Sequence, residues 1–136
     1  MRVVDASALV AVLTDGGDIG DWAAEQLPGF RLAAPHLLPA EVANVLRRAV
    51  NTGHISADAG VQAYADLLRL HFTLYPFAPF AERIWELRGA TSTYDAWYVA
   101  LAETLGADLV TLDRRLARAH GPRCTFITPG ERDSLH

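Results

Sequence analysis

Two aspartates in this 136-residue sequence each follow a short aliphatic run and stand directly before a predicted helix. Asp5 follows the run at 2–4, and Asp113 follows the run at 109–112. If both runs are parallel strands of one sheet, the two carboxylates emerge at its carboxyl edge, where open α/β sheets bind ligands. Helix capping alone does not explain a strand-end acid that recurs in two matched contexts. We therefore interpret Asp5 and Asp113 as parts of one site.

Glu41 and Asp95 fall in the first turns of two further predicted helices. Glu41 lies beside an apolar stripe, and Asp95 follows Ser92 and Thr93, either of which can cap its helix. Acids are common in first helical turns because they complement the helix dipole, so each acid taken alone can be only a cap. Whether Asp95 reaches the edge that carries Asp5 is left open, because a simple helix-to-strand connection does not fix its position.

A cluster of these four carboxylates predicts a bound divalent cation. Two like charges about 4 Å apart repel by about 4 kcal/mol at an effective dielectric constant of about 20. Such a cluster needs a cation or must retain a proton. Because the ligands are oxygen atoms and no His or Cys stands at metal-ligand spacing, Mg²⁺ or Mn²⁺ is favoured over zinc. A hard cation held by carboxylates suits phosphoryl chemistry, since it orients a phosphate and lowers the pKa of bound water.

The basic residues exclude several other classes of function. All twelve are arginine, so the sequence has neither the lysine of a P-loop nor a lysine for Schiff-base chemistry. The net charge of −4 argues against broad, non-specific nucleic-acid binding but leaves room for a local arginine patch. Cys124 is the single cysteine, so no internal disulfide forms, and a reducing cytoplasm fits.

Length and hydrophobic content predict one domain spanning residues 1–136. A chain of this size buries roughly 68% of the surface that it exposes when unfolded. Met1 leads straight into a core strand, so we expect no signal peptide and a cytoplasmic protein. The longest apolar run, 6–13, is far shorter than the ~20 residues that span a bilayer, so we expect no membrane segment.

Strands and helices are predicted to alternate along the chain, with a frayed tail at 131–136. This alternation predicts an α/β fold with a parallel sheet of four to five strands, flanked by helices on both faces. The predicted strands are 2–4, 30–33, 72–75, 109–112 and 124–127. The predicted helices are 5–13, 19–27, 37–50, 56–70, 79–88, 93–105 and 114–119.

Three blocks of this sequence resemble the signature blocks of PIN-domain ribonucleases, and most closely those of VapC toxins. The blocks are VVDASALV, LPAEVANVLRRA and TYDAWYVALAETLGADLVTLDRRLA. The first block is common and carries little weight by itself, whereas the third is specific. The likeness covers nearly the whole chain, in order and at the usual spacing.

This resemblance implies a PIN fold and a metal-dependent active site. The acids that match the family's site are Asp5, Glu41, Asp95 and Asp113, which in the family gather around Mg²⁺ or Mn²⁺. Asp5 and Asp95 match the positions most directly tied to the metal. Ser7 and Thr111 match hydroxyl positions beside the cluster.

The resemblance also implies a function and partners. VapC toxins are endoribonucleases that cut RNA by metal-assisted hydrolysis, form homodimers and are silenced by a cognate VapB-type antitoxin. We therefore expect a toxin of a type II toxin–antitoxin system. The alternative is a PIN scaffold that binds RNA or a regulatory partner without cleavage. A metal-dependent phosphatase is weakened because Asp5-Ala6-Ser7 lacks a second aspartate two residues after the first.

Two further residues are candidates for supporting or substrate-binding roles. Asn44 lies one turn after Glu41 and can orient it, although an amide on the helix surface is an equal alternative. Arg114, like Arg115 and Arg118, follows the fourth acid closely and can contact RNA phosphates, since guanidinium binds phosphate bidentately. A solvated helix face is the alternative for these arginines.

Overall fold

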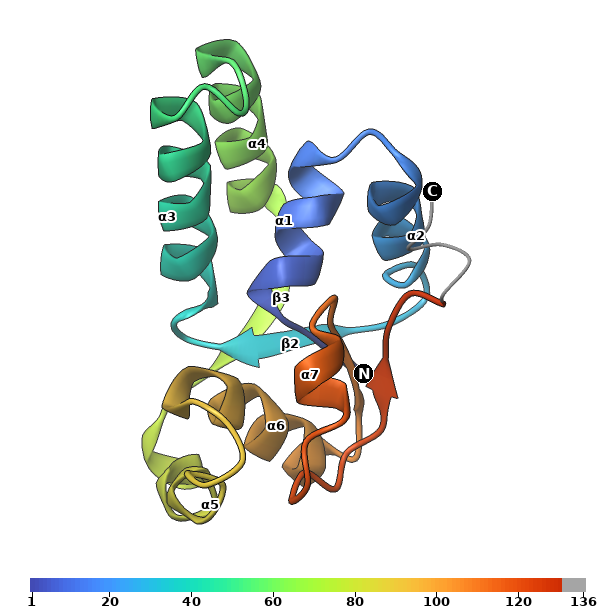
Figure 1. Ribbon diagram of the computed structural model, residues 1–136, viewed down its shortest axis with the longest axis vertical. Coiled ribbons are helices and arrows are strands. Elements are labelled where there is room, and N and C mark those ends of the chain that lie inside the picture. Colours follow the sequence, from blue (N-terminus) through green and yellow to red (C-terminus); the bar gives the residue numbers. More distant parts are fainter. Residues whose placement is uncertain (131–136) are drawn as a thin grey trace.

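The computed structural model describes residues 1–130, which contain a five-stranded parallel sheet (Figure 1). Its strands are β1 (Arg2–Val4), β2 (Leu32–Pro35), β3 (Phe72–Tyr75), β4 (Asp108–Val110) and β5 (Phe126–Ile127). Their order across the sheet is β3-β2-β1-β4-β5, and every neighbouring pair is parallel. Because β1 and β4 are neighbours, the strand ends that precede Asp5 and Asp113 lie side by side.

Helices cover both faces of the sheet, which confirms the predicted architecture. They are α1 (Ala6–Thr14), α2 (Asp18–Glu25), α3 (Leu38–Asn51), α4 (Ala57–Arg69), α5 (Ala81–Glu86), α6 (Thr93–Leu105) and α7 (Arg114–Ala117), with a 3₁₀ turn η1 (Ala78–Phe80). In Figure 1, α1 to α4 lie on one side of the sheet and α5 and α6 lie on the other. α6 packs against β1, β2 and β4, and α1 packs against α2, α3 and α4.

The direction of α6 shows at which edge of the sheet Asp95 lies. Gly106 ends the helix in the left-handed conformation (φ 60°), two residues before β4 begins at Asp108. The end of α6 therefore lies at the amino edge of the sheet, and its first turn lies at the carboxyl edge. A helix that returns the chain to a parallel strand has to run this way, so the connection does fix the position of Asp95.

The second strand lies two residues later than the predicted 30–33. Gly29 adopts a positive φ of 84°, and Phe30 donates its backbone N–H to the Leu27 carbonyl at 3.4 Å. These contacts prolong the turn after α2, so the chain joins the sheet only at β2.

The fourth strand begins and ends earlier than the predicted 109–112. Asp108, which stands just before the predicted strand, pairs with Arg2 in the register of β1. The strand ends at Val110, and Thr111 still donates its backbone N–H to the Ile127 carbonyl at 3.0 Å.

Other elements are shorter than predicted. The predicted helix at 79–88 is split into η1 and α5, while α7 stops at Ala117 and β5 starts at Phe126. The predicted tail at 131–136 lies outside the described residues. Within residues 1–130, the helices lack the combination of length and apolar character that crossing a membrane requires.

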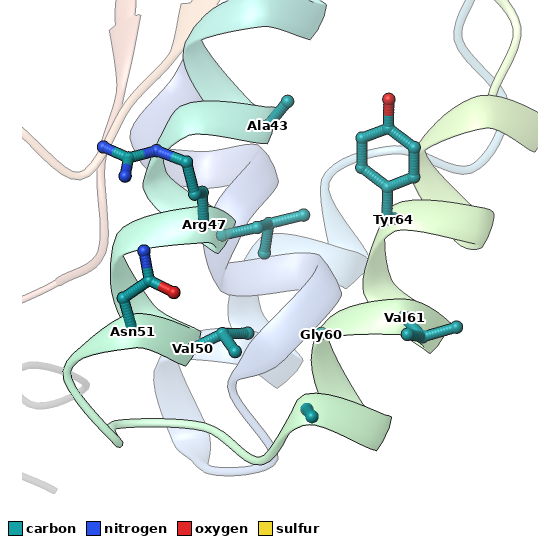
Figure 2. Close-up of a pocket in the computed structure, with 9 residues that line it drawn as sticks. Ala43, Arg47, Val50, Asn51, Gly60, Val61 and Tyr64 are labelled. Carbon is teal, nitrogen blue, oxygen red and sulfur yellow. The ribbon is translucent and has the colours of Figure 1, made fainter.

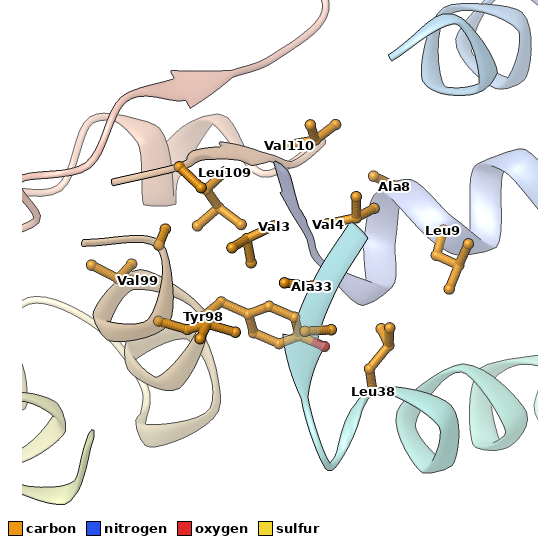
Figure 3. Packing of buried hydrophobic residues seen from close by; sticks show 14 of the residues in the cluster. Val3, Val4, Ala8, Leu9, Ala33, Leu38, Tyr98, Val99, Leu109 and Val110 are labelled. Carbon is orange, nitrogen blue, oxygen red and sulfur yellow. The ribbon is translucent and has the colours of Figure 1, made fainter. Parts of the chain in front are cut away.

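The core fixes the strand ends that carry the acids. Figure 3 shows Val3 of β1, Leu109 and Val110 of β4, and Tyr98 of α6 within one apolar cluster. The three strand residues are fully buried, and Tyr98 is only 2% exposed. Close packing on both faces of the central strands leaves little freedom for the residues that follow them.

Candidate active site

Asp5 is a buried carboxylate held by three hydrogen-bond donors. It is 5% exposed and caps α1, with Oδ1 accepting the Ala8 backbone N–H at 3.0 Å and the Ser7 hydroxyl at 2.6 Å. Its Oδ2 accepts the hydroxyl of Thr111, which is fully buried. The carboxylate therefore has both a fixed position and a fixed orientation.

The hydroxyls of Ser7 and Thr111 also join the ends of β1 and β4. Ser7 Oγ accepts the Leu112 backbone N–H at 3.1 Å, and Thr111 Oγ1 accepts the Asp113 backbone N–H at 2.9 Å. Asp5 donates its own backbone N–H to the Val110 carbonyl at 3.1 Å. The two strand-end acids thus belong to one continuous hydrogen-bonded unit.

Asp95 and Asp113 line a pocket of about 380 Å³ between the start of α6 and α7. Asp95 is half-buried, and its Oδ2 accepts the Thr91 hydroxyl at 3.4 Å. Asp113 is exposed, and its Oδ1 caps α7 by accepting backbone N–H groups of Arg115 and Leu116 at 2.9 and 3.2 Å. One oxygen of Asp113 is thus committed to a cap, which is the structural role that an aspartate at the N-cap position commonly has.

Glu41 is joined to the site by Tyr98. The Tyr98 hydroxyl donates to Glu41 Oε1 at 2.9 Å. In Figure 3 the Tyr98 ring lies below Ala33 of β2, with its hydroxyl oxygen directed toward Leu38 at the start of α3. Tyr98 is itself buried, with 2% of its surface exposed. Its spacing of three residues from Asp95 was the signal for a polar contact, because such residues share a helix face.

Electrostatic repulsion connects all four acids. Burial raises the pKa of Asp5 above its usual value, hydrogen bonds from Ser7, Thr111 and Ala8 lower it, and repulsion from Asp95 raises it. The net direction is upward. The buried hydroxyl donors therefore only partly offset the cost of holding a charge inside the protein.

The pKa values of Glu41 and Asp95 are also raised. For Glu41 the largest cause is burial, opposed by the Tyr98 hydrogen bond and reinforced by repulsion from Asp95 and Asp5. For Asp95 burial again comes first, followed by repulsion from Asp113. Asp95 is thus the acid that links the other three electrostatically.

The arginines form no ion pairs with these acids in the part of the chain that the structure describes. Its ion pairs join Arg69 to Asp66, and Arg83 to Glu86 and Glu103. Carboxylates with raised pKa values and only oxygen donors are a set that suits a hard divalent cation. Within residues 1–130, however, no group of three or more acidic, His or Cys side chains is arranged to hold a metal ion together. Ligation by more than two of these acids therefore requires side-chain movement.

Asn44 and Arg114 make contacts other than the predicted ones. Asn44 is exposed, and its Oδ1 accepts from Arg47 Nε at 3.1 Å, so the structure gives no hydrogen bond from Asn44 to Glu41 within residues 1–130. Arg114 donates from Nη2 to the Pro129 carbonyl at 2.8 Å. Of the arginines that follow the fourth acid, Arg115 is the one that lines the acidic pocket.

A second pocket, of about 440 Å³, is apolar and lies between α3 and α4 (Figure 2). Figure 2 shows Val50 and Arg47 of α3 and Val61 and Tyr64 of α4 around it. Its lining contains no carboxylate. The chemistry expected of the four acids therefore belongs to the sheet edge.

Comparison with known proteins identifies the family. A match to the PIN domain spans residues 2–122. VapC ribonuclease Mb0985 of Mycobacterium bovis is 43% identical, and the alignment covers 91% of this chain and 94% of that protein. Ribonuclease VapC12 of Mycobacterium tuberculosis is 38% identical, with 89% and 93% covered.

Solved structures agree with the fold. The crystal structure of PAE2754 from Pyrobaculum aerophilum aligns with a TM-score of 0.63 and 28% identity, covering 85% of this chain and 82% of that one. The crystal structure of Mycobacterium tuberculosis VapC20, a sarcin-ricin-loop-cleaving toxin, aligns with a TM-score of 0.61 and 19% identity, covering 80% and 87%. The family match and the sequence identities together mean that this chain belongs to the PIN-domain family and is a VapC-type ribonuclease.

Proposed function

We propose that this chain is the toxin of a type II toxin–antitoxin pair and a Mg²⁺-dependent endoribonuclease. One observation carries the proposal. Four carboxylates from four separate segments, Asp5, Glu41, Asp95 and Asp113, are electrostatically coupled at one sheet edge without an arginine partner within residues 1–130. Such an arrangement is costly unless a cation neutralises it.

In this proposal Asp5 and Asp95 would hold Mg²⁺ directly, with Mn²⁺ as a substitute. Glu41 and Asp113 would complete the ligand shell or position the attacking water. The cation supplies charge neutralisation at the phosphate and lowers the pKa of a bound water. In the hydrolysis, the water oxygen gives up a proton and bonds to phosphorus, one ester P–O bond of the RNA backbone breaks, and the leaving ribose oxygen keeps the electron pair and takes up a proton as a hydroxyl.

The remaining residues prepare the acids for this role. Ser7 and Thr111 fix the Asp5 carboxylate, so little reorganisation is needed when its charge is used. The Tyr98 hydroxyl fixes one oxygen of Glu41 by a hydrogen bond and leaves the other oxygen for water or metal. For Asn44 we keep the proposed supporting role, although its contact is with Arg47 and not with an acid: Asn44 Oδ1 accepts from Arg47 Nε.

The proposed partners follow from the relatives, several of which are named as VapC ribonucleases. We propose a cognate VapB-type antitoxin as the inhibitor, a homodimer as the assembly and the cytoplasm as the location. The proposed single domain spans residues 1–136.

Mapping of RNA 5′ ends tests the proposed activity. The purified chain is incubated with total RNA and MgCl₂, and new 5′ ends are mapped and compared with those from cells after induced expression. We expect the same discrete cleavage sites in both samples. RNA binding without new ends would contradict the nuclease and favour a PIN scaffold that binds RNA or a regulatory partner.

Tyr98→Phe is expected to lower kcat by about tenfold, the lower end of the loss seen when a group that orients a metal ligand is removed. The ring still fills the core, so the free energy of unfolding should fall by only about 1 kcal/mol. Metal affinity, measured by calorimetry with MnCl₂, should fall as well.

Tyr64→Phe is the matched control, because Tyr64 is 48% exposed on α4 and lies beside the apolar pocket. It should leave kcat and metal affinity unchanged. Equal kcat values for the two variants would show that the Tyr98 hydroxyl does not position Glu41.

A further inference from the structure

The two arginines directly after Asp113 occupy different environments. Arg114 is half-buried, and its Nη2 donates to the Pro129 carbonyl at 2.8 Å, which ties α7 to the segment after β5. Arg115 is exposed and is one of the residues that line the pocket containing Asp95 and Asp113. The two arginines are adjacent in the sequence, but only Arg115 lines the pocket that contains the acids.

The Arg115 guanidinium is available for a ligand. Among residues 1–130 it makes neither an ion pair nor a side-chain hydrogen bond, although Asp95 and Asp113 line the same pocket. Its backbone is nevertheless well placed, because the Arg115 N–H is held by Asp113 Oδ1 at 2.9 Å. Arg115 thus has a backbone that is held in place and a guanidinium without an ion-pair partner within residues 1–130, beside two of the acids. These features suit a negatively charged ligand.

We propose that Arg115 binds a backbone phosphate of the RNA next to the bond that is cut, and that Arg114 has a structural role. This inference rests on the proposed ribonuclease function. RNA carries a phosphate at every nucleotide, and the acids of this site repel each phosphate that a metal ion does not cover. Arg115 offsets that repulsion, and its planar guanidinium can bind two phosphate oxygens at once.

The net charge of the chain favours a local contact of this kind over attraction by the whole surface. With a net charge of −4, the protein as a whole does not attract RNA. Individual arginines near the acids can supply the attraction locally. Arg118 is exposed one turn after Arg115 but does not line the pocket, so it provides a control with the same change of charge.

Binding is measured first, by fluorescence anisotropy with a labelled single-stranded RNA oligonucleotide that spans a mapped cleavage site, in EDTA so that no cleavage occurs. Arg115→Ala should weaken binding about tenfold, as expected for the loss of one charge-assisted contact. The slope of log K against log salt concentration should become shallower by about 0.7, the value for one phosphate contact on a single strand. Arg115→Lys should lie between Arg115→Ala and the wild type, because it keeps the charge and loses the bidentate contact.

Cleavage of the same oligonucleotide in MgCl₂ completes the test. Arg115→Ala should raise KM and leave kcat nearly unchanged, because a contact that is equally strong in substrate and transition state affects binding alone. Arg118→Ala should leave KM and the salt slope unchanged, and Arg114→Ala should lower Tm with little effect on the slope.

Two outcomes overturn the inference in distinguishable ways. If the wild type cleaves the oligonucleotide and Arg115→Ala matches Arg118→Ala in both KM and salt slope, Arg115 does not bind phosphate and the nuclease proposal stands. If the wild type neither binds nor cleaves RNA, both proposals fall.

Discussion

Asp95→Asn is expected to reduce RNA cleavage by roughly a thousandfold and to leave the protein folded. A metal ion contributes several kcal/mol to the stabilisation of a phosphoryl-transfer transition state, and each 1.4 kcal/mol corresponds to about tenfold in rate. Asparagine keeps the shape of the side chain and one acceptor oxygen, but it removes the charge that binds a cation. Rates are measured with a labelled oligonucleotide, and Tm is measured in the same buffer.

The fold should survive because Asp95 contributes little to stability. It is repelled by Asp113, Asp5 and Glu41, and the hydrogen bond that it accepts from Thr91 is long at 3.4 Å. Neutralising this side chain removes repulsion, so without metal the variant should be as stable as the wild type or slightly more stable.

Asp5 is a poorer choice for this experiment. Asp5→Ala removes the acceptor for the Ser7 and Thr111 hydroxyls and for the Ala8 N–H. Leaving a buried donor unsatisfied costs about 1–3 kcal/mol. Loss of activity in that variant would therefore combine loss of a metal ligand with loss of structure.

Asp58→Asn is the matched control for Asp95→Asn. Asp58 lies in the first turn of α4, which is capped by Ser56 as α6 is capped by Ser92. It is exposed and does not line the acidic pocket. The control should cleave RNA at the wild-type rate. If Asp95→Asn cleaved as fast as this control, with contaminating nuclease excluded, Asp95 would not be a metal ligand.

The strand-end acids were predictable because their context is local. An aliphatic run followed by an acid and a helix start is visible within ten residues, and a parallel sheet then brings Asp5 and Asp113 to one edge. The alternation of strands and helices in turn predicts the parallel sheet. The boundaries of β2 and β4 depended instead on a turn at Gly29 and on pairing between Asp108 and Arg2. The turn at Gly29 is local, since Phe30 bonds to Leu27. The pairing of Asp108 with Arg2, in contrast, joins residues far apart in the sequence.

The contacts that differ from the sequence expectations depend on tertiary structure. Tyr98 meets Glu41 across 57 positions of sequence, and Arg114 turns away from the acids because the Pro129 carbonyl lies within its reach. Asn44 is the exception, because its partner Arg47 lies three residues later on the same helix and the contact is therefore local. Residue type and spacing identify the charges of a site, whereas packing decides which of them face it.

Divalent metal is expected to control both activity and stability. EDTA should stop cleavage, and MgCl₂ at about one hundred times its Kd should stabilise the fold by about 2.7 kcal/mol, or roughly 8 °C in Tm. The reason is that the cation relieves repulsion among Asp5, Glu41 and Asp95, each of which has a raised pKa in the metal-free protein. Tm is measured by differential scanning fluorimetry with and without MgCl₂.

The stabilisation of the fold by Mg²⁺ should depend on pH. Because the three carboxyls have higher pKa values in the folded protein than in the unfolded chain, where they lie near 4, the folded state binds more protons. In EDTA, stability should therefore fall as pH rises from about 4 through the raised pKa values and should level off above them. Mg²⁺ competes with those protons, so its stabilising effect should grow over the same pH range. Asp95→Asn should weaken the pH dependence of stability in EDTA and the pH dependence of the stabilisation by Mg²⁺. If Mg²⁺ raised the Tm of this variant as much as that of the wild type at every pH, the metal would bind elsewhere.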